Sequence, residues 1–497
     1  MRGRRGLIAT LLAVASIAVV VFLMTGGSTV VSAPSSATYE SDQGGDTEGE
    51  ARGGETESEE EAQLTQERVD AWQAAKAAGN LRVTQTAAAA PTSGWVGETV
   101  VDPKADDWEP AIAADPKAPF VYELVTRYSG ATACGNPCPL PYIGLRVSTD
   151  NGSTWGPMRF LCECRRVQGQ FDPIIEVVPN TGAVYAVWMN DFNVFFSKST
   201  DHGATWSTPV PTYANVAWND KPVLAMSDNG QDVYISWNGP NNGDPWVAQS
   251  HDGGATWTQT QIVDGPRYYF AFDADVLPNG TVVFAESSIS YTGPGGAAEG
   301  QVFYHVIRST NGGATWQDSV IDRLELGEPC TATGCTADYY YGHPAVSADA
   351  NGALVYLHDG ALVAGGPQSV WAQTSTDGGA TWTSRALLST TGINSTFPAM
   401  ESRGSGDVRV WYMQADGGKD AWNVWYRSST NGGGTWSAPV KISDSTTGAP
   451  YKSSAGFKEP YGDYGEAAIT NTGKFIGIWG EGKSYTGPGG VWLNRQT

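Results

Sequence analysis

The sequence predicts an all-β fold made of many short strands, and three observations carry this prediction. Of its 497 residues, 61 are glycine and 19 are tryptophan, while only 16% are charged, against about 25% in an average globular protein. Such a composition favours short strands joined by tight turns over long helices. The other two observations are two segments that recur along the chain after residue 91.

The first repeat is an eight-residue segment with the pattern Ser-x-Asp/Asn-x-Gly-x-Thr-Trp. It occurs six times, at 148–155, 199–206, 250–257, 309–316, 375–382 and 429–436. An apolar strand such as 424–427 precedes each copy, and another such as 439–442 follows it, so the segment predicts a turn between two strands. Asp or Asn hydrogen-bonds nearby backbone in such a turn, glycine supplies a positive φ, and tryptophan gives an apolar plug.

The second repeat is a polar or aromatic residue before proline, followed by an apolar strand, a glycine turn and an aromatic strand. Five clear copies begin at 108–110, 171–173, 220–222, 342–344 and 397–398, and divergent copies begin near Phe270 and Tyr461. The sequence thus contains seven such strand pairs but six copies of the turn segment. The last strand, 491–493, aligns with 424–426, and residues 92–95 look like the end of a seventh turn. We therefore expect the N-terminal strand, 96–102, to complete the seventh sheet.

The six turn segments resemble the Asp-box, or bacterial neuraminidase (BNR), repeats of the sialidase-like β-propellers, and the resemblance covers 92–497. It implies a propeller whose boxes are structural and lie away from the active site. Together with the strand count, it predicts a seven-bladed β-propeller of four-stranded blades, closed by the N-terminal strand. Closure would leave no free sheet edge. Six blades, as in the well-known sialidases, are the alternative.

The N-terminal 91 residues predict export and a tether. Three arginines precede an apolar run over 7–24, and small residues continue to Ala37, which is the pattern of a secretory signal. The run is also just long enough to span a bilayer, so 1–37 is either a cleaved signal or a retained anchor. Residues 38–91 form an acidic, low-complexity linker with a short helix near 60–78. We expect a monomer that is secreted or anchored outside the cell, touching the membrane only through this segment.

The net charge of -22 excludes most nucleic-acid binding, because no surplus of basic residues exists to neutralise phosphates. An acidic surface also disfavours an anionic sugar as substrate. We expect an extracellular glycan or glycoprotein as partner and no cofactor, although the carboxylates could hold Ca²⁺.

Six cysteines in an exported chain predict disulfides. Cys162 and Cys164 lie too close in sequence to pair easily with each other, so we expect them to join Cys134 and Cys138. Cys330 and Cys335 would then form a separate bridge. A zinc site built from the two closely spaced pairs is the alternative.

The expected site lies on the upper face, where the innermost strands begin and most insertions fall, because loops on a rigid scaffold usually carry function. Paired carboxylates there could act as acid and base on a glycosidic bond, and aromatic and polar groups bind sugars. The catalytic candidates are Glu109, Asp172, Arg267, His343, Asp463, Tyr464 and Glu466. The substrate-binding candidates are Asp107, Trp108, Asp220, Lys221, Tyr269, Tyr340 and Asn394.

The resemblance to sialidases implies an arginine triad, a tyrosine nucleophile assisted by glutamate, and an aspartic acid. The first arginine of that family lies in an F/Y-R-I-P motif, but here the strand reads Asp107-Trp108-Glu109-Pro110, so sialidase activity is not expected. The segment Gly462-Asp463-Tyr464 is similar to one in many secreted sialidase-like proteins. Three functions stay open: a glycoside hydrolase, a non-catalytic glycan- or protein-binding propeller, and a uronate lyase using histidine as base.

Overall fold

The computed structural model describes residues 66, 69–70, 72–79, 91–130, 139–164, 169–216, 218–292, 298–327, 342–416, 422–443, 452–453, 456–460, 465–482 and 489–497. The chain divides into two units, 1–43 and 44–497, and all described residues belong to the second. The predicted signal or anchor lies outside them. Residues 72–77 are helical, and the Trp72 indole donates a hydrogen bond to the Lys104 carbonyl at 3.0 Å. In this part of the chain, no helix has the length and apolarity needed to cross a membrane.

The first three sheets each contain four antiparallel strands in chain order. The first sheet has β2 (Asp106–Ala114), β3 (Val121–Ser129), β4 (Tyr142–Ser148) and β5 (Arg159–Phe160). The second has β6 (Gln170–Val177), β7 (Val184–Asn190), β8 (Val194–Ser199) and β9 (Val210–Pro211). The third has β10 (Asp220–Met226), β11 (Val233–Asn238), β12 (Pro245–Ser250) and β13 (Thr258–Gln261), with the short helix α2 (Pro240–Gly243) between β11 and β12.

The next eight strands form one sheet in which two runs of four are joined by a single pairing, Glu325 with Ala361. The first run, called the fourth sheet here, has β14 (Tyr268–Val276), β15 (Val282–Ser290), β16 (Glu299–Ser309) and β17 (Gln317–Glu325). The second run, called the fifth sheet, has β18 (Ala345–Ala348), β19 (Leu354–Ala361), β20 (Gln368–Ser375) and β21 (Ala386–Leu387).

The sixth sheet has β22 (Ser395–Arg403), β23 (Asp407–Gln414), β24 (Asn423–Ser429) and β25 (Val440–Lys441). The seventh has β28 (Glu466–Ile469), β29 (Phe475–Gly482), β30 (Gly489–Arg495) and, from the other end of the chain, β1 (Thr99–Val100). A separate pair contains β26 (Lys452–Ser453) and β27 (Gly456–Pro460). The described chain is therefore all-β, as the composition predicts.

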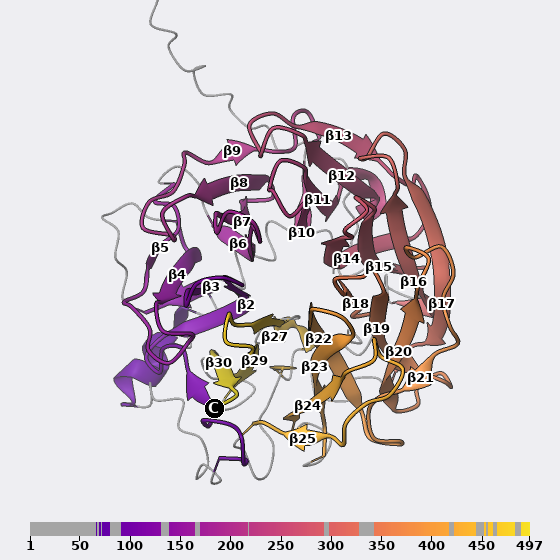
Figure 1. Ribbon diagram of the computed structural model, residues 1–497. Coiled ribbons are helices and arrows are strands. Elements are labelled where there is room, and N and C mark those ends of the chain that lie inside the picture. Colours follow the sequence, from indigo (N-terminus) through magenta and orange to yellow (C-terminus); the bar gives the residue numbers. More distant parts are fainter. Residues whose placement is uncertain are drawn as a thin grey trace, which may run out of the picture. The chain divides into compact units, whose positions relative to one another are not determined.

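In the first six sheets, the first strand lies nearest the centre in Figure 1 and the last strand lies farthest out. Each first strand contacts the first strand of the next sheet, from β2 through β6, β10, β14, β18 and β22 to β28, and β28 contacts β2. The hydrophobic core lies between neighbouring sheets. One cluster, for example, joins Tyr122 and Leu124 of the first sheet to Ile175 and Trp188 of the second. Because both faces of the second strands are covered, these strands read as nearly continuous apolar runs.

Strand β1 joins the two ends of the described chain. Thr99 pairs with Leu493 and Val100 with Trp492, in antiparallel register. The Asp106 carboxylate also accepts a hydrogen bond from the Gly489 amide at 2.8 Å. The seventh sheet is thus completed by a strand that precedes the first sheet in sequence.

The six repeated segments form matching turns, called box turns here. In the first, Ser148 Oγ donates to Asp150 Oδ1 at 2.8 Å, and Asp150 accepts the Thr154 amide at 2.8 Å and its hydroxyl at 2.6 Å. The Gly152 amide donates to Ser148 Oγ at 2.9 Å, with φ of 76°. Asn311 takes the place of Asp in the fourth turn and accepts the Thr315 amide in the same way. The side chains therefore close each turn locally, without neighbouring sheets.

We predict that Asp201→Asn keeps the melting temperature near wild type at pH 7, whereas Asp201→Ala lowers it. Hydrogen bonds from Thr205 lower the pKa of Asp201 to about 2. The stability from this carboxylate is therefore present above its ordinary pKa near 3.9 and is lost as the pH falls toward 2. The Asn variant should lose that acid dependence, since an amide does not titrate. Thermal melts between pH 2 and pH 7 check this, and equal melting of the Ala variant and wild type would contradict it.

Candidate functional site

The residues before proline occupy β-bulges at the start of the first strands. Glu109, Asp172, Lys221 and Phe397 have φ of 50°, 49°, 48° and 51°, and the strand register shifts at each of these points. A residue before proline normally prefers an extended backbone. A left-handed conformation at a residue other than glycine costs about 1–3 kcal/mol and is concentrated at functional sites. We call these four bulge residues, with His343 before Pro344, the mouth residues.

Glu109 links two sheets at the mouth. Its Oε2 atom accepts a hydrogen bond from the Thr126 hydroxyl at 2.5 Å and from the Asp172 amide of the next sheet at 3.1 Å. Two predicted catalytic carboxylate residues are therefore neighbours across the boundary between the first and second sheets. Lys221 occupies the same bulge position one sheet further on.

His343 is oriented by a buried carboxylate. Its Nδ1 lies 2.9 Å from Asp359 Oδ2, and its amide donates to Asp359 Oδ1 at 2.9 Å. Thr396 Oγ1 donates to the same carboxylate, and the imidazole packs against the Phe397 ring with centroids 3.9 Å apart. Burial alone would raise the pKa of Asp359, but His343 and Thr396 outweigh it and lower the pKa. With Nδ1 bonded to Asp359, Nε2 is the nitrogen that accepts a proton in neutral His343.

Arg267 and Tyr269 belong to a hydrogen-bonded chain in the fourth sheet. Arg267 Nε donates to Ser288 Oγ at 2.8 Å, and that oxygen lies 2.8 Å from His305 Nε2. His305 Nδ1 lies 2.8 Å from Asp318 Oδ1, and the Tyr269 hydroxyl donates to Asp318 at 3.2 Å. The residue types match a Ser-His-Asp triad. Ser288 is fully buried, however, so this chain holds strands together and does not present a nucleophile.

Asp107 forms a buried ion pair within the first sheet. Arg127 donates to it twice, at 2.6 and 2.7 Å, and Arg127 also lies 3.1 Å from Asp102. Burial raises the pKa of Asp107 to about 6, against the opposing effect of Arg127. The guanidinium and carboxylate therefore face each other within the protein.

Three more substrate-binding candidates also make scaffold contacts. The Trp108 indole donates to Asp106 at 3.0 Å. Asp220 accepts a hydrogen bond from Asn238 at 3.1 Å, and the Asn394 side chain accepts the Gln368 amide at 2.9 Å. Their contribution to binding stays a prediction. Tyr340, Asp463 and Tyr464 lie outside the described residues.

Glu466, at the start of β28, belongs to a group of acids on the first strands, and the sequence reasoning missed the other members of this group. It accepts the Ile112 amide of the first sheet at 2.7 Å. Asp273 and Asp275 accept the Val346 and Ala348 amides of the fifth sheet at 2.9 and 2.7 Å. We call Glu176, Asp273, Asp275, Glu401 and Glu466 the central acids. They could have been found as acids that break otherwise apolar first strands.

The central acids have raised pKa values. Burial, reinforced by Asp273 and Asp275, raises the pKa of Glu176 to about 8. Burial raises the pKa of Asp273 to about 7 and that of Asp275 to about 6. Within the described ranges, no group of three or more His, Cys, Asp or Glu residues is placed to hold a metal ion. Calcium binding therefore stays an untested expectation.

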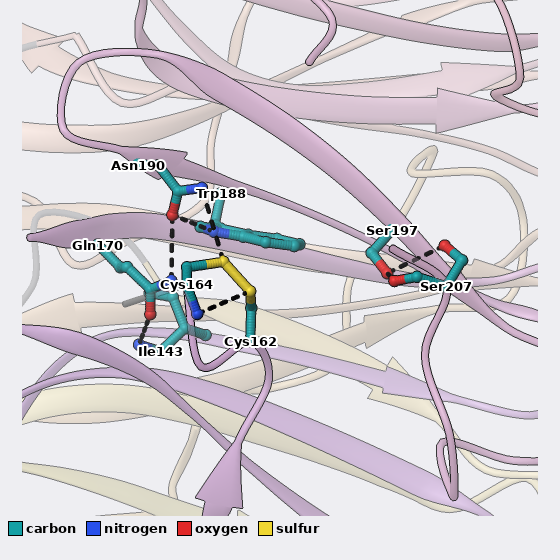
Figure 2. Close-up of a disulfide and its surroundings, with 8 residues drawn as sticks. All are labelled: Ile143, Cys162, Cys164, Gln170, Trp188, Asn190, Ser197 and Ser207. Carbon is teal, nitrogen blue, oxygen red and sulfur yellow. Dashed lines mark hydrogen bonds between the residues drawn. A yellow bond between two sulfur atoms is a disulfide. The ribbon is translucent and has the colours of Figure 1, made fainter. Parts of the chain in front are cut away.

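The cysteine prediction was wrong for Cys162 and Cys164, which form a disulfide with each other, as Figure 2 shows. The chain bends between them and brings their Cα atoms to 5.3 Å, inside the range of roughly 4.4–6.8 Å that a disulfide needs. The Cys164 sulfur accepts a hydrogen bond from Asn190 at 3.8 Å. Cys134, Cys138, Cys330 and Cys335 lie outside the described residues.

Comparison with known proteins gives similarity of structure without a family. No family model matches the sequence, and no curated protein matches it. A polysaccharide lyase described as a PL25 ulvan lyase is 10% identical over 80% of this chain and 94% of its own, with a TM-score of 0.49. The Hadza microbial sialidase Hz136 is 15% identical over 76% of each chain, with a TM-score of 0.43. The intramolecular trans-sialidase from Ruminococcus gnavus is 13% identical over 82% of this chain and 98% of its own, with a TM-score of 0.40.

We predict that Glu176→Gln raises the melting temperature by at least about 2 °C at pH 9 and changes it little at pH 5. The pKa of Glu176 is raised from its ordinary value to about 8, so its contribution to stability falls as the pH rises through that range. Replacing Glu176 by Gln removes the negative charge that forms on the carboxylate as the pH rises through this range. Thermal melts at both pH values measure the difference. The exposed Glu299→Gln serves as control, and equal shifts at pH 5 and pH 9 for Glu176→Gln would contradict the prediction.

Proposed function

We propose that the described sheets form a seven-bladed β-propeller closed by the N-terminal strand. The support is the cyclic order of contacts among the seven first strands and the pairing of β1 with β30. The fourth and fifth sheets would be separate blades, because in the described chain one pair within their strands, Glu325 with Ala361, and one bridge just beyond them, Gly327 with Gly366, join them.

Closure predicts that Val101→Pro destabilises the whole protein. The Val101 amide donates to the Val491 carbonyl at 2.8 Å, and proline has no N–H to replace that bond. Val101→Ile retains the amide and the apolar burial and serves as control. Chemical unfolding should show a lower midpoint in a single transition for the Pro variant. An unchanged midpoint, or loss of a separate local transition only, would contradict closure.

We infer that the protein is an exported enzyme that acts on extracellular glycans at the mouth, with chemistry like that of a glycoside hydrolase. The observation that carries this proposal is the bulge that holds Glu109 and Asp172 at matching positions of adjacent sheets. A glycosidase needs two carboxyl groups flanking the bond that it cleaves. The backbone strain at both positions is consistent with a site, since such strain persists where function retains it. Export is supported by the arginines and apolar run at the N-terminus.

A uronate lyase is a second candidate because of His343. Asp359 fixes its Nδ1 as the bonded nitrogen, so Nε2 is suited to remove the proton next to a sugar carboxylate. Lys221 would supply the positive charge that such a substrate needs. The acid-rich surroundings oppose an anionic substrate, so this candidate stands second.

We predict that the full-length protein releases reducing sugar from at least one neutral polysaccharide in a panel of arabinan, galactan, xylan and mannan. Glu109→Gln and Asp172→Asn should each lower kcat by about 100-fold or more, since each removes an acid–base group. Asp377→Asn is the matched control, because Asp377 is exposed in a box turn at the opposite end of the strands, where Asn311 of the fourth box turn accepts the equivalent hydrogen bond. Sugar release and thermal stability are measured together, so that a folding defect is recognised.

The same assay separates the other functions. With a polyuronate added to the panel, new ultraviolet absorbance from an unsaturated uronate, lost in His343→Gln and shifted in its pH profile by Asp359→Asn, would favour the lyase. Binding without turnover on every substrate would contradict both enzyme proposals and favour the glycan- or protein-binding alternative.

A further inference from the structure

A pocket of 470 Å³ opens between the third and fourth sheets, among the box turns. Its lining includes Asp232, Tyr234, Gln249 and His251 from the third sheet and Asn279 and Gly312 from the fourth. In each sheet, the bulge lies at the start of the first strand, and the turn between the first and second strands lies at the other end. The box turns lie at that other end: the Gly253 amide, for example, donates to the carbonyl of Gln231, just before β11. The pocket is therefore separate from the mouth residues.

The equivalent place between the first and second sheets is filled by two rings. Phe120 and His202 stack with centroids 4.0 Å apart and an interplanar angle of 3°. His202 Nδ1 lies 3.5 Å from the hydroxyl of Tyr122. The tyrosine at this position thus has both a covering ring and a hydrogen-bond partner.

Between the second and third sheets the same place is filled in another way. Lys198 crosses the boundary and donates to the Gly253 carbonyl at 2.7 Å. The hydroxyl of Tyr185, which corresponds to Tyr122, donates to the Gly230 carbonyl at 2.9 Å. Again the tyrosine is covered and its hydroxyl is bonded.

Between the third and fourth sheets the filling groups are replaced. In the repeat alignment, Asp232 stands where Phe120 does, and Gly312 stands where His202 does. Gln249 stands where Lys198 does, and its Oε1 atom is buried without a hydrogen-bond partner. Within the described residues, the Tyr234 hydroxyl also has no partner among the hydrogen bonds formed. The unbonded Tyr234 hydroxyl therefore lies at a space that the other two boundaries fill.

We propose that this pocket binds a neutral saccharide, independently of the mouth. Its volume lies in the usual range for small ligands, about 300–1,000 Å³. The Tyr234 hydroxyl offers a hydrogen-bond donor, and the Asp232–His251 pair, with Oδ1 and Nδ1 2.7 Å apart, offers further polar groups for hydroxyls. No lysine or arginine is among the described lining residues, and Asp232 repels anions, so acidic sugars are disfavoured.

The hydroxyl of Tyr234 stays protonated under ordinary conditions. Burial, with Asp232 nearby, raises its pKa to about 12. It therefore acts as a hydrogen-bond donor at every pH at which the protein would be assayed. Glycines at 280 and 312 leave the approach to this group open, because a Cβ atom at Gly312 would lie 3.8 Å from the tyrosine oxygen.

The test is a saturation-transfer NMR titration of the full-length protein with glucose, galactose, mannose and N-acetylglucosamine. At least one sugar should bind with millimolar affinity. Gly312→His should weaken that binding at least tenfold, because it restores the ring that fills the equivalent place beside Tyr122. The backbone accepts this change, since His202 has φ of 56° where Gly312 has 67°. Tyr234→Phe should also weaken binding, because it removes only the hydroxyl.

Gly432→His is the matched control, because it makes the same change in another box turn, at φ of 64° and with no atom within 4 Å of the new Cβ. It should leave binding unchanged. The proposal is overturned if no sugar binds, or if binding survives Gly312→His undiminished. It is also overturned if binding is lost only in Glu109→Gln, which would place the sugar at the mouth. Failure here would leave the mouth proposal standing, since the two sites share no residue.

Discussion

The unpaired edge of each first strand is the constraint on which the centre of this protein depends. A first strand has a hydrogen-bonded neighbour on one side only, so the amides of its other edge need acceptors from elsewhere. Carboxylates of adjacent sheets meet that need. Glu466 accepts the Ile112 amide, Asp273 the Val346 amide and Glu109 the Asp172 amide. Side chains thus join neighbouring sheets where backbone pairing does not.

This solution concentrates negative charge at the centre and has an electrostatic cost. The central acids raise one another's pKa values in addition to the effect of burial: Asp273 and Asp275 raise the pKa of Glu176 in this way. Part of the net acidity of the chain therefore serves the contacts between sheets, and it does not by itself identify a cation site. If the mouth is the site proposed above, the same acidity sets the charge that a substrate meets there, and an uncharged glycan suits it better than an anionic one.

The features that the sequence could predict are those whose contacts lie within a short segment of the chain. The box turns were predictable because Asp150 and its equivalents bond only within their own eight residues. The mouth position of Glu109 was readable from the proline repeat, but its left-handed backbone was not. The sequence did not reveal contacts with partners elsewhere in the chain: Arg267 donates a hydrogen bond to Ser288, and Asp107 accepts one from Arg127. Pairing of Cys162 with Cys164 depends on a local bend that spacing alone does not reveal.

A repeated fold can create a site by omission as well as by addition. At the mouth, Glu109 and Asp172 place carboxylates at matching bulges of adjacent sheets. At the box turns, the residue after Asp or Asn varies among Asn151, His202 and glycine while the turn itself is unchanged. Because the turn closes on its own hydrogen bonds, this residue is free to fill the boundary or leave it open. Gly312 leaves it open beside the Tyr234 hydroxyl, whose equivalents at the two earlier boundaries are hydrogen-bonded, so in the proposed pocket one small residue turns a packing position into a place for a ligand.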